Sequence, residues 1–142
     1  MLIAIIGENC VGKSTLANQI NEKRSATIYS GKDYLRLEKN PALALDKFRK
    51  LLQASLTGED VIYIITEKEH IELLPEDAFR ILLTAELDTI KARFKERMRG
   101  NLPMPVEKML ETKHGMYDHL DCNLKLDSNY NIEDVLSALT LK

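Results

Sequence analysis

The residues from Gly7 to Ser14 constrain this chain more than any other stretch of it. They read Gly-Glu-Asn-Cys-Val-Gly-Lys-Ser and match the pattern Gly-x-x-x-x-Gly-Lys-[Ser/Thr] at every fixed position. A run of five apolar residues, 2–6, precedes the pattern and predicts a buried strand, while residues 13–23 carry apolar positions at helical spacing. Glycines let the loop curl so that its amides face one concavity, toward which the positive end of the helix also points. The sequence therefore predicts a strand, a phosphate-binding loop and a helix that together bind a nucleoside triphosphate.

Within this loop the residue types suggest separate roles. Lys13 supplies a compact cation for the β- and γ-phosphates, Ser14 supplies a hydroxyl for Mg²⁺, and Thr15 is expected near the α-phosphate. Cys10 is interpreted as a small filler of a variable position, the alternative being a thiol made reactive by the surrounding amides. The predicted nucleotide-binding residues are Gly7, Glu8, Asn9, Cys10, Val11, Gly12, Lys13, Ser14 and Thr15.

Length and composition limit the remaining possibilities. A chain of 142 residues is expected to form one domain, 1–142. Its composition, with 44% hydrophobic and 30% charged residues, is typical of a globular protein. No apolar run approaches the roughly 18–20 residues that a membrane span needs, and the start lacks the basic opening of a secretory signal. The net charge of −2 argues against a nucleic-acid partner. We therefore expect a cytoplasmic protein that has neither a membrane nor a nucleic-acid partner.

Strand and helix patterns alternate along the rest of the chain. Further strands are predicted at 26–29, 61–65, 79–84 and 122–126. Helices are predicted from Asn40-Pro41 to about Gly58, at 87–99, at 106–114, and after Asn131 as a cap. This alternation predicts an α/β protein whose parallel sheet is covered on both faces.

This order of elements resembles the small phosphate-loop kinases, a group that includes nucleoside monophosphate kinases, shikimate kinase and gluconate kinase. Residues 80–97, Arg-Ile-Leu-Leu-Thr-Ala-Glu-Leu-Asp-Thr-Ile-Lys-Ala-Arg-Phe-Lys-Glu-Arg, look like the strand–helix–lid unit of the cytidylate kinase-like enzymes. The resemblance implies a three-layer α/β fold with a five-stranded parallel sheet in the order 2-3-1-4-5. It also implies an acceptor-binding region at about 31–60 and a lid at about 95–116.

In that group, arginines of the lid contact the phosphates, and the resemblance makes Arg93, Arg97 and Arg99 the candidates here. Arg93 and Arg97 are four residues apart and share one helical face. Guanidinium groups beside a phosphoryl group neutralise charge that develops during transfer, so Arg97 joins Lys13 as a predicted catalytic residue. The alternative is a solvated cationic face of the helix.

Three acceptor-side and metal candidates lie near strand ends. Asp33 follows the second strand, where ligands of open α/β sheets bind. The resemblance to shikimate and gluconate kinases, in which an aspartate near this place contacts the acceptor hydroxyl, implies that Asp33 acts as a general base or holds Mg²⁺ through water. Its alternative role is that of a turn residue. Arg36 is a candidate clamp for an anionic acceptor, and Glu67 a candidate Mg²⁺ ligand where related enzymes carry aspartate. For Glu67 the alternative is an ordinary acid in the first turn of a helix.

The function implied by the resemblance is transfer of the γ-phosphoryl group from ATP, with Mg²⁺, to a nucleoside monophosphate or a small hydroxylated metabolite, by a monomer or homodimer. A nucleotide-dependent binding module or slow ATPase is the alternative, because no aspartate ends the 61–65 strand. A GTPase is disfavoured by the lack of an Asn-Lys-x-Asp motif, and a nucleic-acid end kinase by the acidic charge balance. Lys113 and His114 are interpreted as plain polar surface. The resemblance to the small phosphate-loop kinases also implies that residues 127–131 flank the base.

Overall fold

A computed structural model describes residues 1–140 of the chain. Its centre is a five-stranded sheet formed by β1 (Leu2–Ile6), β2 (Thr27–Ser30), β3 (Val61–Ile65), β4 (Phe79–Leu83) and β5 (Leu124–Leu126). All neighbouring strands are parallel and follow the order β2-β3-β1-β4-β5. The predicted α/β class and strand order are confirmed.

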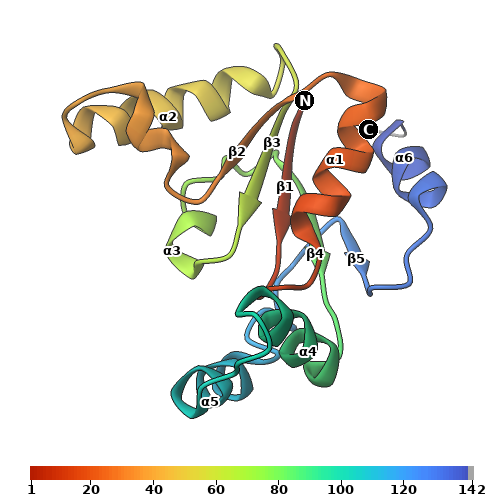
Figure 1. The fold of residues 1–142 in the computed structure, drawn as a ribbon. Helices are drawn as coiled ribbons and strands as arrows, with labels where there is room; N and C mark the ends of the chain where they lie inside the picture. The colour runs from red at the N-terminus through yellow and green to blue at the C-terminus, as the bar shows by residue number, and fades with distance from the viewer. Residues whose placement is uncertain (141–142) are drawn as a thin grey trace.

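Successive side chains of β1 point to opposite faces of the sheet, so its unbroken apolar run supplies two cores. Ile3 and Ile5 pack in the core that also contains residues of α1 (Lys13–Arg24) and α6 (Ile132–Thr140). Leu2, Ala4 and Ile6 pack on the other side against α2 (Pro41–Ser55). Figure 1 shows α1 and α6 on one side of the sheet and α2 on the other. The result is three layers, with β1 fully buried at the centre.

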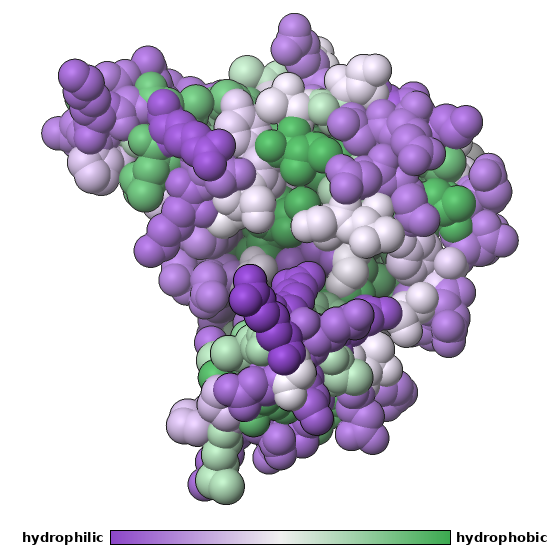
Figure 2. Space-filling model, viewed as in Figure 1, coloured by the Kyte–Doolittle hydropathy of each residue, from purple (hydrophilic) through white to green (hydrophobic). Residues whose placement is uncertain are grey.

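Two further helices, α4 (Leu87–Arg97) and α5 (Met104–Lys113), lie beyond the carboxyl ends of the strands (Figure 1). Lys91 of α4 forms ion pairs with Glu107 and Glu111 of α5, at 3.7 and 2.7 Å. The predicted lid region, 95–116, covers the end of α4, a connection, all of α5 and the three residues that follow it. Figure 2 shows strongly hydrophilic side chains gathered over α4, near the carboxyl ends of the strands.

Several predicted boundaries differ from the structure by a few residues, as at α2, which ends at Ser55 instead of Gly58. Its start is as predicted, because the side-chain oxygen of Asn40 accepts hydrogen bonds from the amides of Ala42 and Leu43. Asn131 likewise accepts from the amide of Glu133 at the start of α6. The 3₁₀ helix η1 (Asp33–Leu37) and the four-residue α3 (Lys68–Ile71) are not predicted, since neither is long enough to show a hydrophobic period.

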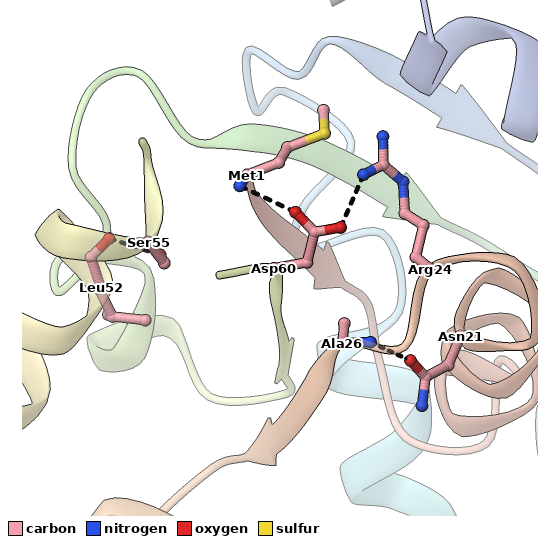
Figure 3. Close-up of polar contacts among 7 residues, drawn as sticks. All are labelled: Met1, Asn21, Arg24, Ala26, Leu52, Ser55 and Asp60. Carbon is pink, nitrogen blue, oxygen red and sulfur yellow. Dashed lines mark hydrogen bonds and ion pairs between the residues drawn. The ribbon is translucent and has the colours of Figure 1, made fainter. Parts of the chain in front are cut away.

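Ion pairs hold the amino end of the sheet together. Asp60 accepts hydrogen bonds from the Met1 amino group at 3.0 Å and from Arg24 at 2.9 Å (Figure 3). The Asn21 side chain accepts from the amide of Ala26 and so holds the turn between α1 and β2. These contacts fasten the start of β1 to the segments that lead into β2 and β3.

No helix within residues 1–140 combines the length and the apolar character that crossing a membrane requires.

Candidate nucleotide and phosphoryl-transfer site

The predicted phosphate loop connects β1 to α1 at the carboxyl edge of the sheet. The amide of Gly7 donates to the carbonyl of Ile65 in β3, and a Cβ atom at Gly7 would lie 2.6 Å from the carbonyl oxygen of Leu83. The loop is thus seated directly on two strand ends, with no space for a side chain at its first position. Gly12 has φ +103°, a left-handed conformation that glycine adopts at low cost, and it caps α1.

Cys10 also adopts a left-handed conformation, with φ +64°, and its side chain is buried in the core under the loop. Left-handed backbone at a residue other than glycine is uncommon and concentrates at functional sites. The buried side chain agrees with the interpretation of Cys10 as a filler.

Lys13, the first residue of α1, folds back into the loop. Its Nζ donates to the carbonyls of Gly7 and Glu8, both at 2.7 Å, and the residue is 7% exposed. Burial is the main influence on this ammonium and lowers the pKa of Lys13 to about 8; the nearby Arg97 guanidinium acts in the same direction. The partners within hydrogen-bond distance are neutral, so the site holds a cation whose charge is incompletely compensated. An anion bound there would restore the ordinary preference for the charged form.

A cavity of about 430 Å³ opens on the α4 side of the loop, and we call it the nucleotide cavity. Loop residues form one wall, α4 forms a second, and the segment after β5 forms a third. Its lining residues are Cys10, Val11, Gly12, Thr15, Arg93, Glu96, Arg97, Ser128 and Tyr130. Ser128 and Tyr130 belong to the segment 127–131, which sequence analysis expects beside a base.

The three candidate arginines occupy different places. Arg93 lines the nucleotide cavity and donates to the Cys10 carbonyl at 3.0 Å. Arg97 lines the same cavity and is close enough to Lys13 to act on its charge. Arg99 lies past the end of α4, with φ +59°, and is not part of the cavity wall. The structure therefore brings two of the three arginines to the phosphate loop.

Ser14 and Thr15 lie in the first turn of α1 with exposed side chains, and Thr15 also lines the nucleotide cavity. Glu67 follows β3, is exposed, and makes no capping hydrogen bond although it occupies the N-cap position of α3. Its carboxylate is close enough to Lys13 to raise the pKa of that lysine against the effect of burial. Ser14 and Glu67, the predicted metal ligands, thus both lie near the loop.

Of the two acceptor-side candidates, Asp33 and Arg36, the structure gives Asp33 a role in a turn. The Asp33 carboxylate accepts a hydrogen bond from the amide of Ser30 at 2.9 Å, which is the turn role that sequence analysis held as the alternative. Arg36 is exposed on η1. Asp33 remains at the carboxyl end of β2, and one of its oxygens holds this turn.

Sequence analysis missed the contacts made by the side chain of Glu8. Its carboxylate lies 3.1 Å from Nδ1 of His114 and accepts from the amide of Gly115 at 3.0 Å. Nearby, Tyr117 donates to the carbonyl of Thr66 at 2.5 Å. His114 was interpreted as plain surface, yet it bonds to the loop itself. The partners are 106 positions apart, so no local pattern could reveal the pairing.

Glu8 and Thr66 also line a second cavity, beside Asn9 of the loop. Its volume is only about 20 Å³, and we call it the small cavity. Its lining residues are Glu8, Asn9, Thr66, Glu67, Leu110, Lys113 and Met116. Glu8 and His114 together line a third cavity, of about 250 Å³.

No family model and no curated protein matches this chain. Among solved structures it is similar to shikimate kinase from Bacteroides thetaiotaomicron, with a TM-score of 0.60 and 15% identity over 99% of this chain and 97% of that one. A gluconokinase from Sinorhizobium meliloti 1021 gives a TM-score of 0.60 and 12% identity over 96% and 87%. The tunicamycin resistance protein of Deinococcus radiodurans gives 0.62 and 17% over 99% and 93%. With its phosphate loop, strand order and near-complete coverage, the chain has the fold of the small phosphate-loop kinases.

Proposed function

We propose that this protein transfers the γ-phosphoryl group of ATP to a small hydroxylated acceptor, a nucleoside monophosphate or another small metabolite. The observation that carries the proposal is Lys13, a buried ammonium whose two hydrogen-bond partners are neutral carbonyls of the loop. A cation so placed, beside the amino end of α1, favours an anion with several oxygens.

The residues present fit ATP in its usual orientation on such a loop. The loop amides and Lys13 would hold the β- and γ-phosphates, and Arg93 and Arg97 reach the same cavity from α4. Ser128 and Tyr130 line the same cavity, and the ring of Tyr130 would give a bound base an aromatic neighbour. Kinase-like neighbours of known structure agree with this chemistry.

Magnesium fits the same site. Mg²⁺ binds through one or two protein oxygens together with substrate phosphates, and the Ser14 hydroxyl and the Glu67 carboxylate would supply the protein oxygens. When bound, the ion neutralises charge on the phosphates. The work left to the chain is positioning and electrostatic stabilisation, in which Lys13 and Arg97 act on the transferred group.

The acceptor would approach from the carboxyl ends of β2 and β3, where Asp33, Arg36 and the small cavity lie. A carboxylate such as Asp33 could take the proton of the attacking hydroxyl, provided that it gives up its bond to the Ser30 amide.

Acceptor-stimulated release of ADP tests the proposal. The protein is incubated with ATP, Mg²⁺ and a panel of nucleosides, nucleoside monophosphates, sugars and hydroxy acids, one compound at a time. We expect at least one compound to raise turnover well above the rate without acceptor, and to appear as a phosphorylated product by mass spectrometry. Binding of ATP without stimulation by any member of the panel would contradict the proposal.

One observation favours a second candidate function, a nucleotide-dependent binding module that hydrolyses ATP slowly. The strand β3 is followed by Thr66 and Glu67 and lacks the aspartate that many phosphate-loop enzymes place there. A partner protein that is retained only when the nucleotide is bound would support this candidate over the kinase.

A further inference from the structure

The segment that follows β5 forms a turn that uses its own hydrogen-bonding groups. The side chain of Asp127 accepts from the amide of Asn129 at 2.9 Å, and its backbone carbonyl accepts from the amide of Tyr130 at 3.2 Å. Both amides are therefore engaged inside the turn, although Ser128 and Tyr130 line the nucleotide cavity. An amide that already donates within a turn is not free to read the edge of a base.

The polar side chains in the lining of the nucleotide cavity do not distinguish one purine from the other. Apart from Thr15 and the two arginines, which are assigned above to the phosphates, they come from Glu96, Ser128 and Tyr130. A hydroxyl both donates and accepts, so it suits the edge of either purine. A carboxylate accepts from an amino group, which adenine and guanine both carry.

The ring of Tyr130 is held in place between the core and α1. It packs against the core that contains residues of α1 and α6, and its hydroxyl donates to the side-chain oxygen of Gln19. Burial raises the pKa of Tyr130, so the hydroxyl keeps its proton at neutral pH. Gln19 lies four residues after Thr15, on the same face of α1 as that cavity residue. An aromatic wall of the nucleotide cavity is thus fastened to the helix that begins at the phosphate loop.

An aromatic ring binds a base through its face, and every base has such a face. Stacking of this kind changes affinity by about tenfold or more and tolerates a change of base. A site that stacks the base and leaves its edge unread selects for the area of the ring system, which is larger in purines than in pyrimidines.

We propose that the donor site accepts both purine nucleoside triphosphates, ATP and GTP, and recognises the base by stacking on Tyr130. This rests on the function proposed above and widens its phosphoryl donor. Tyr130 touches the base, whereas Gln19 acts through Tyr130 and is a positioning residue.

Titration calorimetry of the native protein tests the proposal, with Mg²⁺ and ATP, GTP, UTP or inorganic triphosphate as the ligand. We expect the Kd values for ATP and GTP to agree within about threefold, and the value for UTP to be about tenfold higher, since a single ring stacks over less area. Inorganic triphosphate has no base and reports on the phosphate loop alone. A preference of more than about tenfold for one purine would overturn the proposal, because it would require a group that reads the edge of that base.

Three variants separate stacking from phosphate binding. Tyr130→Leu removes the ring and should weaken ATP and GTP by the same factor, about tenfold, while the Kd of inorganic triphosphate stays within about twofold. Tyr130→Phe and Gln19→Leu keep the ring but lose its hydrogen bond, so each should weaken both nucleotides about threefold. The matched control is Asn18→Leu, at an exposed neighbouring position of α1, which should change none of the Kd values.

Because Tyr130 also packs against the core, Gln19→Leu keeps the test decisive if Tyr130→Leu folds poorly. Unchanged nucleotide affinity in these variants would overturn the stacking role, and so would an equal loss for the nucleotides and for inorganic triphosphate. Either result leaves the proposed function in place, because phosphoryl transfer does not require stacking. If the native protein binds neither ATP nor GTP, the proposed function fails and this inference fails with it.

Discussion

At the amino end of the sheet Asp60 meets two cations, whereas at the carboxyl end Lys13 meets two neutral carbonyl oxygens. Burial acts to raise the pKa of Asp60, but hydrogen bonds from the Met1 amino group and Arg24 outweigh it, and the pKa falls below its ordinary value. Burial also dominates at Lys13, and there the pKa falls to about 8. A lowered pKa favours the charged carboxylate of Asp60 but disfavours the charged ammonium of Lys13.

This difference separates a structural ion cluster from a ligand site. The charges around Asp60 satisfy one another within the chain and need nothing further. The charge of Lys13 is held at a cost that only an added anion removes, and perturbed groups of this kind concentrate at functional sites. The two ends should therefore respond in opposite ways to substitution, one through stability and the other through binding.

The largest expected effect is the loss of nucleotide binding in Lys13→Ala. Removing a cation that hydrogen-bonds to phosphate oxygens should weaken binding of ATP by about 100-fold, which corresponds to about 2.7 kcal/mol. Titration calorimetry with ATP and Mg²⁺ measures it, and Lys23→Ala, at the exposed last turn of α1, is the control. Unchanged affinity in Lys13→Ala would remove the distinction between the two ends and the phosphate-loop assignment with it.

A smaller effect, on stability and not on nucleotide binding, is expected for Asp60→Asn. The side chain of Asp60 is 24% exposed, so its charged hydrogen bonds are partly screened, and losing them should lower the free energy of unfolding by about 1–2 kcal/mol. Nucleotide affinity should not change. Urea unfolding measures the effect, and the neighbouring exposed Glu59 supplies the control variant Glu59→Gln.

The effect of Asp60→Asn should also depend on pH. The folded-state pKa of Asp60 is lowered, so its contribution is complete above the unfolded value of about 3.9 and disappears as pH falls through the folded value. A destabilisation that did not shrink as the pH falls below about 3.9 would mean that the carboxylate contributes by packing and not by charge.

Sequence analysis predicts the loop and its lysine because their signals are local. β1, the loop and α1 are consecutive, and each has a recognisable pattern in residues 2–24. The strand order came from the resemblance to phosphate-loop kinases, since no feature within a single strand specifies which strand is its neighbour. Asn40 and Asn131 predicted where their helices begin, because an N-cap side chain bonds to residues only two or three positions away.

What sequence analysis missed depends on contacts between distant segments. Nothing around His114 indicates that Glu8 is its partner, and Tyr117 shows no sign of bonding to Thr66. The role of Asp33 was left open because a turn residue and a catalytic carboxylate look alike in sequence. The lowered pKa of Lys13 likewise depends on how deeply the folded loop buries it, which the motif does not state.

The smallest effect, and the sharpest test of the comparison, is the pH dependence of stability in Lys13→Met. The folded pKa of about 8 lies below the unfolded value of about 10.4, so the buried charge costs stability in full below pH 8. Between pH 8 and about 10.4 the folded protein releases the proton before the unfolded chain does, and the native protein recovers stability.

An apolar side chain of similar length avoids that cost but leaves two carbonyls without a partner, so the net gain at pH 7 should be about 1 kcal/mol. Urea unfolding from pH 6 to pH 10 should show this gain shrinking above pH 8, in contrast to Lys23→Met, whose effect should stay constant. A gain independent of pH would show that Lys13 carries no incompletely compensated charge and that the two ends of the sheet do not differ as argued.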